Sequence, residues 1–303
     1  MDKQFFVVIG GQFQFFEMES KTPYDNIDAD VAKFNTIDPY FTAVYNSDFG
    51  FNLNVGGRYN MHSVYDNHFV YNINPSFHFS DLPLKILSSY STAYITPSLY
   101  QLYSPYGNLD LTPEENSTVE AGFEVVFLKN KVTLNTIAFY REEKNSLGFY
   151  TNPDTWVSNY ININGKNNAK GIETMLSYTL SNQFKVSANY TFTQVEAPLS
   201  RLIPKHKGNI ALDYQPMERL FFGVNYQHVD KRNDSFYDSG IFATTHVSLD
   251  AYQLVHAITK YELIKNRMNV FVAVNNILNE DFVEAVGIST RGRNIKAGFN
   301  INF

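Results

Sequence analysis

The stretch FKVSANYTFT, residues 184–193, decides the fold class of this 303-residue chain. Phe184, Val186, Ala188, Tyr190 and Phe192 alternate without exception with lysine, serine, asparagine and threonine. Because successive side chains of a β-strand point to opposite faces, this period of two predicts a strand with one apolar and one polar face.

The same alternation recurs along the whole chain, in roughly 14 segments, and no segment has the periodicity of a good amphipathic helix. The segments lie near residues 3–16, 37–46, 49–60, 64–79, 84–95, 115–128, 131–149, 155–180, 184–196, 206–215, 219–230, 245–260, 266–276 and 291–303. We therefore expect an all-β, antiparallel protein.

Composition removes several classes of protein. Aromatic residues make up 16% of the chain, which excludes a disordered protein. No apolar run approaches the ~18 residues of a membrane-spanning helix. The absence of cysteine excludes a disulfide scaffold, thiolate metal sites and a cysteine nucleophile. The net charge of -6 argues against a nucleic-acid partner. No nucleophile elbow or phosphate loop is present, so we expect neither an enzyme nor a cofactor.

The connections between the segments distinguish a soluble sandwich from a membrane barrel. Every second connection is short: 46–48, 80–83, 129–130, 181–183, 215–218 and 260–265. The intervening ones are mostly long, as at 96–114, 197–205, 231–244 and 277–290. Short turns on one rim and long loops on the other are typical of outer-membrane barrels, with the short turns periplasmic. Several segments also reach the ~9–11 residues that a tilted strand needs to cross a bilayer.

The last segment supports the barrel. Ile295, Ala297, Phe299 and Ile301 share one apolar face, and the chain stops on Phe303. A terminal aromatic residue on such a strand resembles the recognition signal of the barrel-assembly machinery. We therefore predict an antiparallel transmembrane β-barrel in the bacterial outer membrane, with membrane lipid and, through Phe303, the assembly machinery as partners.

Longer motifs carry a family resemblance. The adjoining stretches YSTAYITPSLYQLYSPYGN (90–108) and LDLTPE (109–114) resemble TonB-dependent outer-membrane receptors. Further motifs agree in order: GRYNMH (57–62), Gly165 with AKGIE (169–173), and VNNILN (274–279) with TRGRN (290–294). By these motifs the chain is most similar to the cobalamin (vitamin B12) receptors, with siderophore and haem receptors next.

The resemblance implies a plug domain with a TonB-binding segment, followed by a barrel of about 22 strands. Counting back from Phe303, residues 1–303 would form about the last 14 strands, and the plug and first strands would be absent. Because the start at Met1 shows no export signal, we expect a fragment of a receptor that meets TonB only through the missing plug.

The implied function is active, TonB-energised uptake of a scarce, large nutrient, with cobalamin as the first candidate. A ferric siderophore or haem is the alternative within the family. A self-contained passive, porin-like barrel or an outer-membrane enzyme is the alternative outside it.

Ligands of this family sit between the long extracellular loops and the plug, so we expect contacts in those loops. Tyr100, Tyr103 and Tyr106 would stack against a flat macrocycle or an aromatic siderophore, or would instead brace their loop and the interfacial girdle. Arg201 and Lys205, with the nearby Lys207, would meet negative groups of the ligand, or would be solvated charges.

Two further loop residues complete the candidate contacts, Tyr237 and Ile288. Ile288 stands where the cobalamin receptors resembled here have a ligand-facing tyrosine. Those receptors also have an arginine near the position of Leu202 and Ile203, to which Arg201 is only adjacent. These departures concern the substrate and leave the family resemblance intact.

No metal site is expected. Asp25, Asp28 and Asp30 have the short spacing and oxygen ligands that calcium uses, but a solvated acidic loop is the preferred interpretation. The 7 histidines include no pair four residues apart on a helix, and we expect hydrogen bonding in the barrel interior for those on strands.

Overall fold

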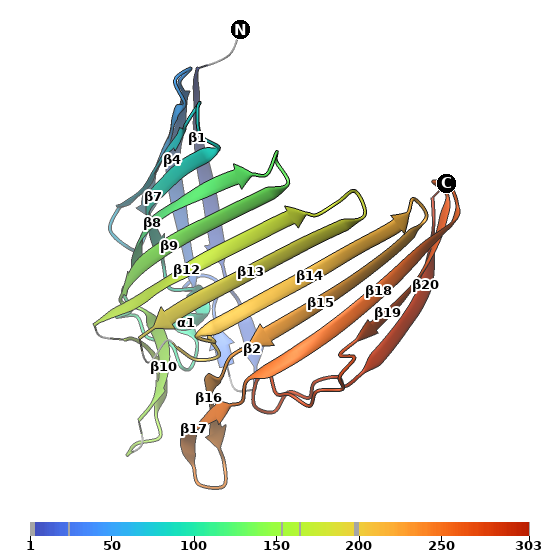
Figure 1. The fold of residues 1–303 in the computed structure, drawn as a ribbon. Helices are drawn as coiled ribbons and strands as arrows, with labels where there is room; N and C mark the ends of the chain where they lie inside the picture. The colour runs from blue at the N-terminus through green and yellow to red at the C-terminus, as the bar shows by residue number, and fades with distance from the viewer. Residues whose placement is uncertain (1–3, 24, 153, 164, 197–199, 303) are drawn as a thin grey trace. The chain divides into compact units, whose positions relative to one another are not determined.

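The computed structural model describes residues 4–23, 25–152, 154–163, 165–196 and 200–302, so Phe303 lies outside the described residues. Fourteen strands form one antiparallel sheet, and each overlaps one of the alternating segments (Figure 1). In sheet order they are β1 (Phe5–Glu17), β4 (Lys33–Asn46), β5 (Phe51–His62), β6 (His68–His78), β7 (Leu84–Ile95), β8 (Glu114–Phe127), β9 (Val132–Lys144), β12 (Lys166–Thr179), β13 (Phe184–Val195), β14 (His206–Met217), β15 (Leu220–Val229), β18 (Tyr252–Ile264), β19 (Met268–Asn275) and β20 (Asn294–Ile301). The prediction of an all-β antiparallel fold is confirmed.

The chain divides into two compact units. Unit 1 comprises residues 1–121 and 139–169, and unit 2 comprises residues 122–138 and 170–303. Within unit 1, β1 is an edge strand that pairs with β4, from Phe5 opposite Tyr45 to Glu17 opposite Lys33. Within unit 2, β20 is an edge strand that pairs with β19.

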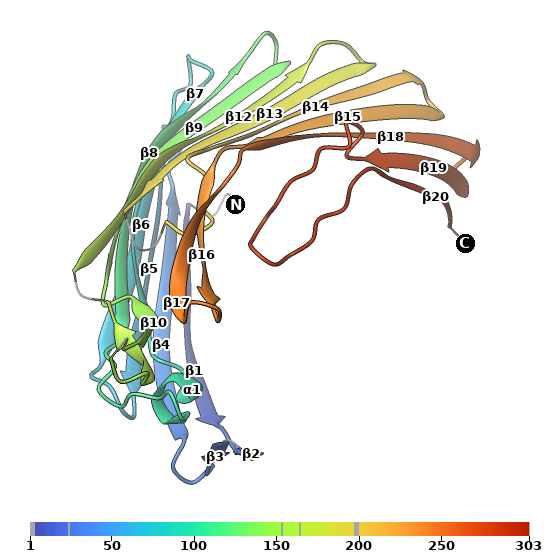
Figure 2. The same cartoon turned by 90° about the horizontal axis from the view of Figure 1, so that it is seen from below.

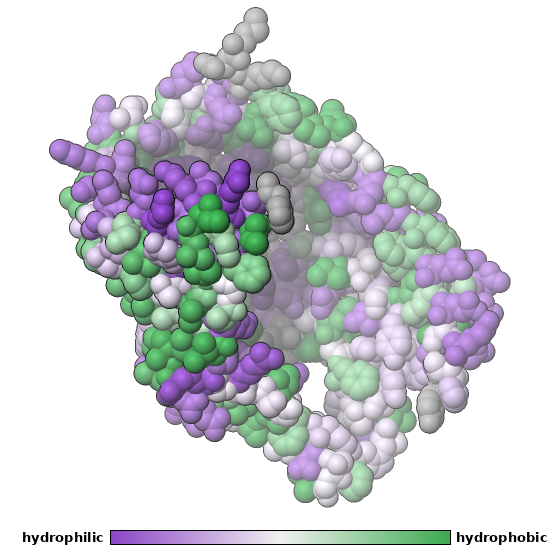
Figure 3. Space-filling model, turned by 90° about the vertical axis from the view of Figure 1, so that its right-hand side faces the viewer, coloured by the Kyte–Doolittle hydropathy of each residue, from purple (hydrophilic) through white to green (hydrophobic). Residues whose placement is uncertain are grey.

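The strand register gathers apolar side chains on one face of the sheet. In unit 2, Ile210 of β14 lies opposite Ala188 of β13 and opposite Tyr226 of β15. Ile210 is 52% exposed and Phe299 is 63% exposed, and Figure 3 shows other apolar side chains at the surface. An exposed apolar face of this kind indicates that the face does not contact water. In a membrane barrel the outer face of each strand contacts lipid.

Three small hairpins lie outside the sheet and were not predicted. They are β2 (Ser20–Thr22) with β3 (Asp25–Ile27), β10 (Leu147–Thr151) with β11 (Ser158–Asn162), and β16 (Arg232–Asp238) with β17 (Ala243–Leu249). The segments 155–180 and 245–260 therefore each combine a hairpin strand with a sheet strand. In unit 1, the hairpin β10–β11 lies at the same end of the strands as α1 (Leu99–Tyr103) (Figure 2).

One short helix, α1, lies in the connection between β7 and β8 and has no amphipathic periodicity in the sequence. Ser98 begins this helix with a capping box: its side chain accepts from the Gln101 N–H at 3.3 Å, and the Gln101 side chain accepts from the Ser98 N–H at 2.8 Å. Such reciprocal capping stabilises a short helix, and five residues are too few for apolar periodicity to reveal it. Among the described residues, no helix has the length and apolarity to cross a membrane.

Glycine is required in the turn between β4 and β5. Gly50 has a φ of +96°, and a Cβ added there would lie 2.1 Å from the backbone oxygen of His78. A side chain at this position would strain the backbone and collide with an atom that cannot rotate away.

We expect Gly50→Ala to lower the free energy of unfolding by about 1–3 kcal/mol, because it combines unfavourable φ with overpacking. Gly11→Ala is the matched control, since a Cβ at Gly11 meets nothing within 4 Å, and it should change stability by less than about 0.5 kcal/mol. Urea unfolding of the protein in lipid vesicles measures both values. Equal stability of the two variants would contradict the assignment.

Candidate ligand-binding site

A cavity of about 680 Å³ opens in unit 1, at the end of the strands where the long connections lie. Its wall is made by β1, β4, β5, β6 and β7 and by the segment that leads into α1. Asp38, Arg58 and Asn60 line it, whereas their neighbours Ile37 and Tyr59 are exposed on the other face. The cavity therefore lies on the polar face of the sheet, which is the interior face of a barrel.

The carboxylate of Asp38 is the centre of this wall, and the residue is only 2% exposed. It accepts hydrogen bonds from Thr36 Oγ1 at 3.1 Å and Asn60 Nδ2 at 2.5 Å. Arg58 Nη2 lies 3.4 Å from its Oδ2. A buried charge needs such partners, and the same contacts balance the charge of Arg58. This pair therefore adds no uncompensated cation to the wall of the cavity.

The β5 side of the wall also keeps unused hydrogen-bonding capacity. Arg58 Nε, Asn60 Oδ1 and His62 Nε2 are buried and have no hydrogen-bond partner within the described part of the chain. Buried polar atoms without partners are uncommon in native proteins. A small shift of these side chains would present two donors and one acceptor to a group in the cavity.

Aromatic rings form the outer part of the site. Tyr100 of α1 lines the cavity, and its ring lies 6.3 Å from that of Tyr160. Phe149 lies 5.2 Å from Tyr160 and 5.6 Å from Tyr106. We call these four residues the loop aromatic cluster. The Tyr160 N–H also donates to the Tyr106 carbonyl at 2.9 Å, so the tyrosines brace the connection. Tyr100 and Tyr106 nevertheless remain 43% and 45% exposed.

Tyr103 is placed differently from Tyr100 and Tyr106. It is half-buried on α1, close enough to Tyr65 to act on that residue's pKa. Burial, reinforced by Tyr94 and Tyr103, raises the pKa of Tyr65 to about 12. Tyr65 therefore keeps its proton at neutral pH.

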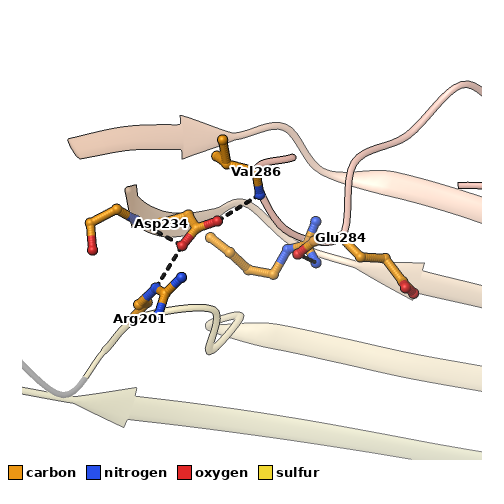
Figure 4. A network of polar contacts seen from close by, with 6 residues as sticks. Arg201, Asp234, Glu284 and Val286 are labelled. Carbon is orange, nitrogen blue, oxygen red and sulfur yellow. Dashed lines mark hydrogen bonds and ion pairs between the residues drawn. The ribbon is translucent and has the colours of Figure 1, made fainter. Parts of the chain in front are cut away.

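In unit 2, a buried carboxylate ties three connections together (Figure 4). Arg201 Nε donates to Asp234 Oδ1 at 2.7 Å, and the backbone N–H of Val286 donates to Asp234 Oδ2 at 2.8 Å. Arg232 Nη2 donates to the Val283 carbonyl at 2.7 Å. We call Arg201, Arg232, Asp234, Val283 and Val286 the loop clamp. The charge of Arg201, a candidate ligand contact, is thus balanced by the carboxylate of Asp234 within the protein.

The loop clamp has no signal in the amino-acid sequence. Asp234 lies 33 residues from Arg201 and 52 residues from Val286 in the chain. Only the folded connections bring them together, and no motif marks Asp234 or Arg232. Partners so far apart in the chain leave no pattern of spacing that would predict their contact.

The other candidate contacts in unit 2 are dispersed. Lys205 Nζ lies 5.8 Å from the centre of the Phe192 ring, on the apolar face. Tyr237 on β16 is 54% exposed, and Ile288 in the connection 276–293 is 61% exposed. No contact joins these three among the described residues, so they do not form a single site by themselves.

The acidic connection before β4 shows local pairing. Asp28 Oδ1 accepts from the Asp30 N–H at 3.0 Å, and Lys33 Nζ lies 3.6 Å from Asp30. Within the described residues, no group of three or more histidine and carboxylate side chains is arranged to hold a metal ion.

The loop clamp should respond to acid. The Val286 N–H, helped by Arg201 and the Ser235 N–H, holds the pKa of Asp234 below its usual value, although burial opposes this. A lowered pKa in the folded state means that the stabilisation is complete above about pH 4 and is lost as the pH falls through the lowered pKa. We expect faster amide hydrogen exchange in residues 276–293 when the clamp opens.

Asp234→Asn should open the clamp at pH 7, with a local cost of about 1–3 kcal/mol, and should remove the acid response. Asp250→Asn is the control because Asp250 is an exposed carboxylate in the same connection. Hydrogen exchange followed by mass spectrometry between pH 7 and pH 3 measures both. Wild-type exchange that is independent of pH, after correction for the intrinsic rate, would contradict the role of Asp234.

Known proteins show where this chain belongs. The vitamin B12 transporter BtuB of Vibrio cholerae serotype O1 is 28% identical over 207 residues, which are 67% of this chain and 32% of that protein. The chain therefore spans about one third of the length of the curated relatives it matches.

Solved structures share the fold. The ferric enterobactin receptor of Pseudomonas aeruginosa in complex with enterobactin matches with a TM-score of 0.79 and 18% identity, over 97% of this chain and 51% of that chain. The copper transporter OprC matches with a TM-score of 0.80 and 14% identity, over 99% and 54%. At these identities the likeness shows the fold alone.

Family membership follows from a longer match. Residues 4–277 fit the family model described as TonB dependent receptor-like, beta-barrel. The alternating strands, the unequal rims and the resemblance in the loop motifs agree with that match. The chain belongs to the TonB-dependent receptor β-barrel family, whose members are transport receptors of the bacterial outer membrane.

Proposed function

We propose that this chain forms part of the barrel wall that binds the ligand in a receptor for cobalamin uptake. In the complete receptor TonB would energise transport through a plug, which the family resemblance places outside residues 1–303. The cavity of unit 1, with Tyr100 at its entrance, is the part of the wall that would meet the ligand.

The charge balance of the cavity carries this proposal. Its wall pairs the guanidinium of Arg58 with the buried carboxylate of Asp38. Neutral hydroxyl and amide groups, such as those of Thr36 and Asn60, surround the pair. A near-neutral corrin ring with amide side chains suits such a wall. A polyanionic ferric siderophore would instead need uncompensated arginine or lysine side chains.

The connections at this end of the strands have the same bias. In unit 1 they contain 7 Asp and Glu but only 1 Lys and no Arg. The connections counted are residues 18–32, 63–67, 96–113 and 145–165. An acidic rim repels anions during approach and favours neutral or cationic ligands. The similarity to BtuB, 28% over two thirds of the chain, supports the same choice.

A ferric siderophore is the second candidate, because the loop aromatic cluster favours it. Tyr100, Tyr106 and Phe149 each expose more than two fifths of their surface. Such rings would stack on the catechol groups of a siderophore as well as on a corrin. The two ligands therefore have to be separated by experiment.

We expect the purified receptor to bind cyanocobalamin, and Tyr100→Ala to weaken binding about tenfold, the effect of losing one aromatic contact. Tyr59→Ala is the matched control, since Tyr59 lies on β5 but on the opposite face from the cavity, and it should bind like the wild type. Isothermal titration in detergent measures the affinities.

Growth separates the candidates in cells. A receptor-null strain that carries the complete gene should recover on limiting vitamin B12 and should not recover on limiting ferric siderophore. Rescue on iron alone would reject cobalamin in favour of the second candidate. An unchanged affinity for Tyr100→Ala would remove the cavity of unit 1 from the ligand site.

A further inference from the structure

A second hollow, of about 420 Å³, lies on the apolar face of unit 2. It is formed by four neighbouring strands, β9, β12, β13 and β14, together with β15, and is mainly apolar. Its lining includes Leu134, Leu176, Ala188, Ile210 and Tyr226. No part of the ligand cavity described above contributes to it.

The register shows that this hollow faces lipid. Gly208 lies opposite Tyr190 and His228, and Ile210 lies opposite Ala188 and Tyr226. Opposed residues share a face, and this face carries the exposed apolar side chains of the sheet. The hollow exists because Gly208 and Ala188 are small where their neighbours are aromatic. It therefore opens toward the acyl chains of the membrane.

Polar and cationic groups stand at one end of the hollow, next to the long connection 196–205. The Tyr190 hydroxyl and His206 Nδ1 share a hydrogen bond of 2.8 Å. The ring of Phe192 lies 5.4 Å from that of His206, and Lys205 Nζ lies 5.8 Å from the centre of the Phe192 ring. An apolar hollow that ends in such groups matches an amphipathic anion.

We propose that this hollow binds a phosphorylated lipid of the outer leaflet, of the lipopolysaccharide class. One acyl chain fills the space between Ala188, Gly208 and Tyr226. A phosphate of the head group meets Lys205 and His206. Lysine side chains at membrane interfaces extend toward charged head groups, and basic sites beside barrel or helix surfaces recognise lipid phosphates.

Filling the hollow tests the acyl-chain contact. A Cβ at Gly208 would lie 3.5 Å from the Asn189 carbonyl oxygen and 3.9 Å from Tyr190, ordinary contact distances that let a larger side chain extend into the hollow. Gly208→Leu should weaken binding of a purified lipid A at least tenfold. Ala297→Leu is the matched control, because Ala297 is exposed on the same face outside the hollow.

Lys205→Gln tests the head-group contact and leaves the buried part of the sheet unchanged. It should weaken binding of phosphorylated lipid A at least fivefold and leave a dephosphorylated lipid A unaffected. Native mass spectrometry of the complete receptor, titrated with lipid A, phosphatidylethanolamine or inorganic phosphate, measures each case. Heat-modifiable mobility on gels confirms that every variant is folded.

Three results would overturn the proposal. Equal binding of lipid A by wild type and Gly208→Leu would remove the hollow as the site. Equal binding of phosphatidylethanolamine and lipid A would remove the phosphorylated glycolipid as its ligand. Binding of inorganic phosphate that survives Gly208→Leu, without lipid A binding, would assign Lys205 and His206 to a free anion.

Discussion

Backbone N–H and C=O groups that lie in hydrocarbon need hydrogen-bond partners within the protein, because the lipid offers none. Long antiparallel strands meet this constraint with their neighbours in the sheet, and the sheet strands here run from 8 to 14 residues. A fixed register then assigns each side chain to one face. A slip of one residue would turn Ile210 toward the polar face and Asn209 toward lipid, so the alternation that reveals the strands also stabilises their pairing.

This constraint does not apply to the connections, and their structure depends on individual side-chain and backbone hydrogen bonds. Ser98 and Gln101 build α1 with two hydrogen bonds, and Asp234 ties three connections of unit 2 through Arg201 and the Val286 N–H. Each contact satisfies backbone or charged groups that would otherwise be left without partners. The receptor can therefore vary its loops while the sheet stays the same, which fits a family whose members transport different ligands.

This difference between strands and connections explains which features of the structure can be predicted from the sequence. Alternation is a local signal, and all 14 sheet strands overlap segments that it predicts. The loop motif beginning at Tyr90 resembles the right family but contains a helix that alternation could not show. Arg201 looked available for a ligand because its partner Asp234 is 33 residues away. Lys205 looked like a loop charge, whereas its contact with Phe192 places it beside the apolar face.

The two faces of one strand can consequently change independently. On β5, Arg58 and Asn60 line the cavity of unit 1, while Tyr59 between them is exposed on the apolar face. On β14, Gly208 and Ile210 shape the hollow, while Asn209 points to the other side and bonds Asn189 at 2.9 Å. Neighbouring positions of one strand therefore have different surroundings, the polar face of the sheet on one side and lipid on the other. Selection for a new ligand can proceed without disturbing the fit to the membrane, provided that the register is kept.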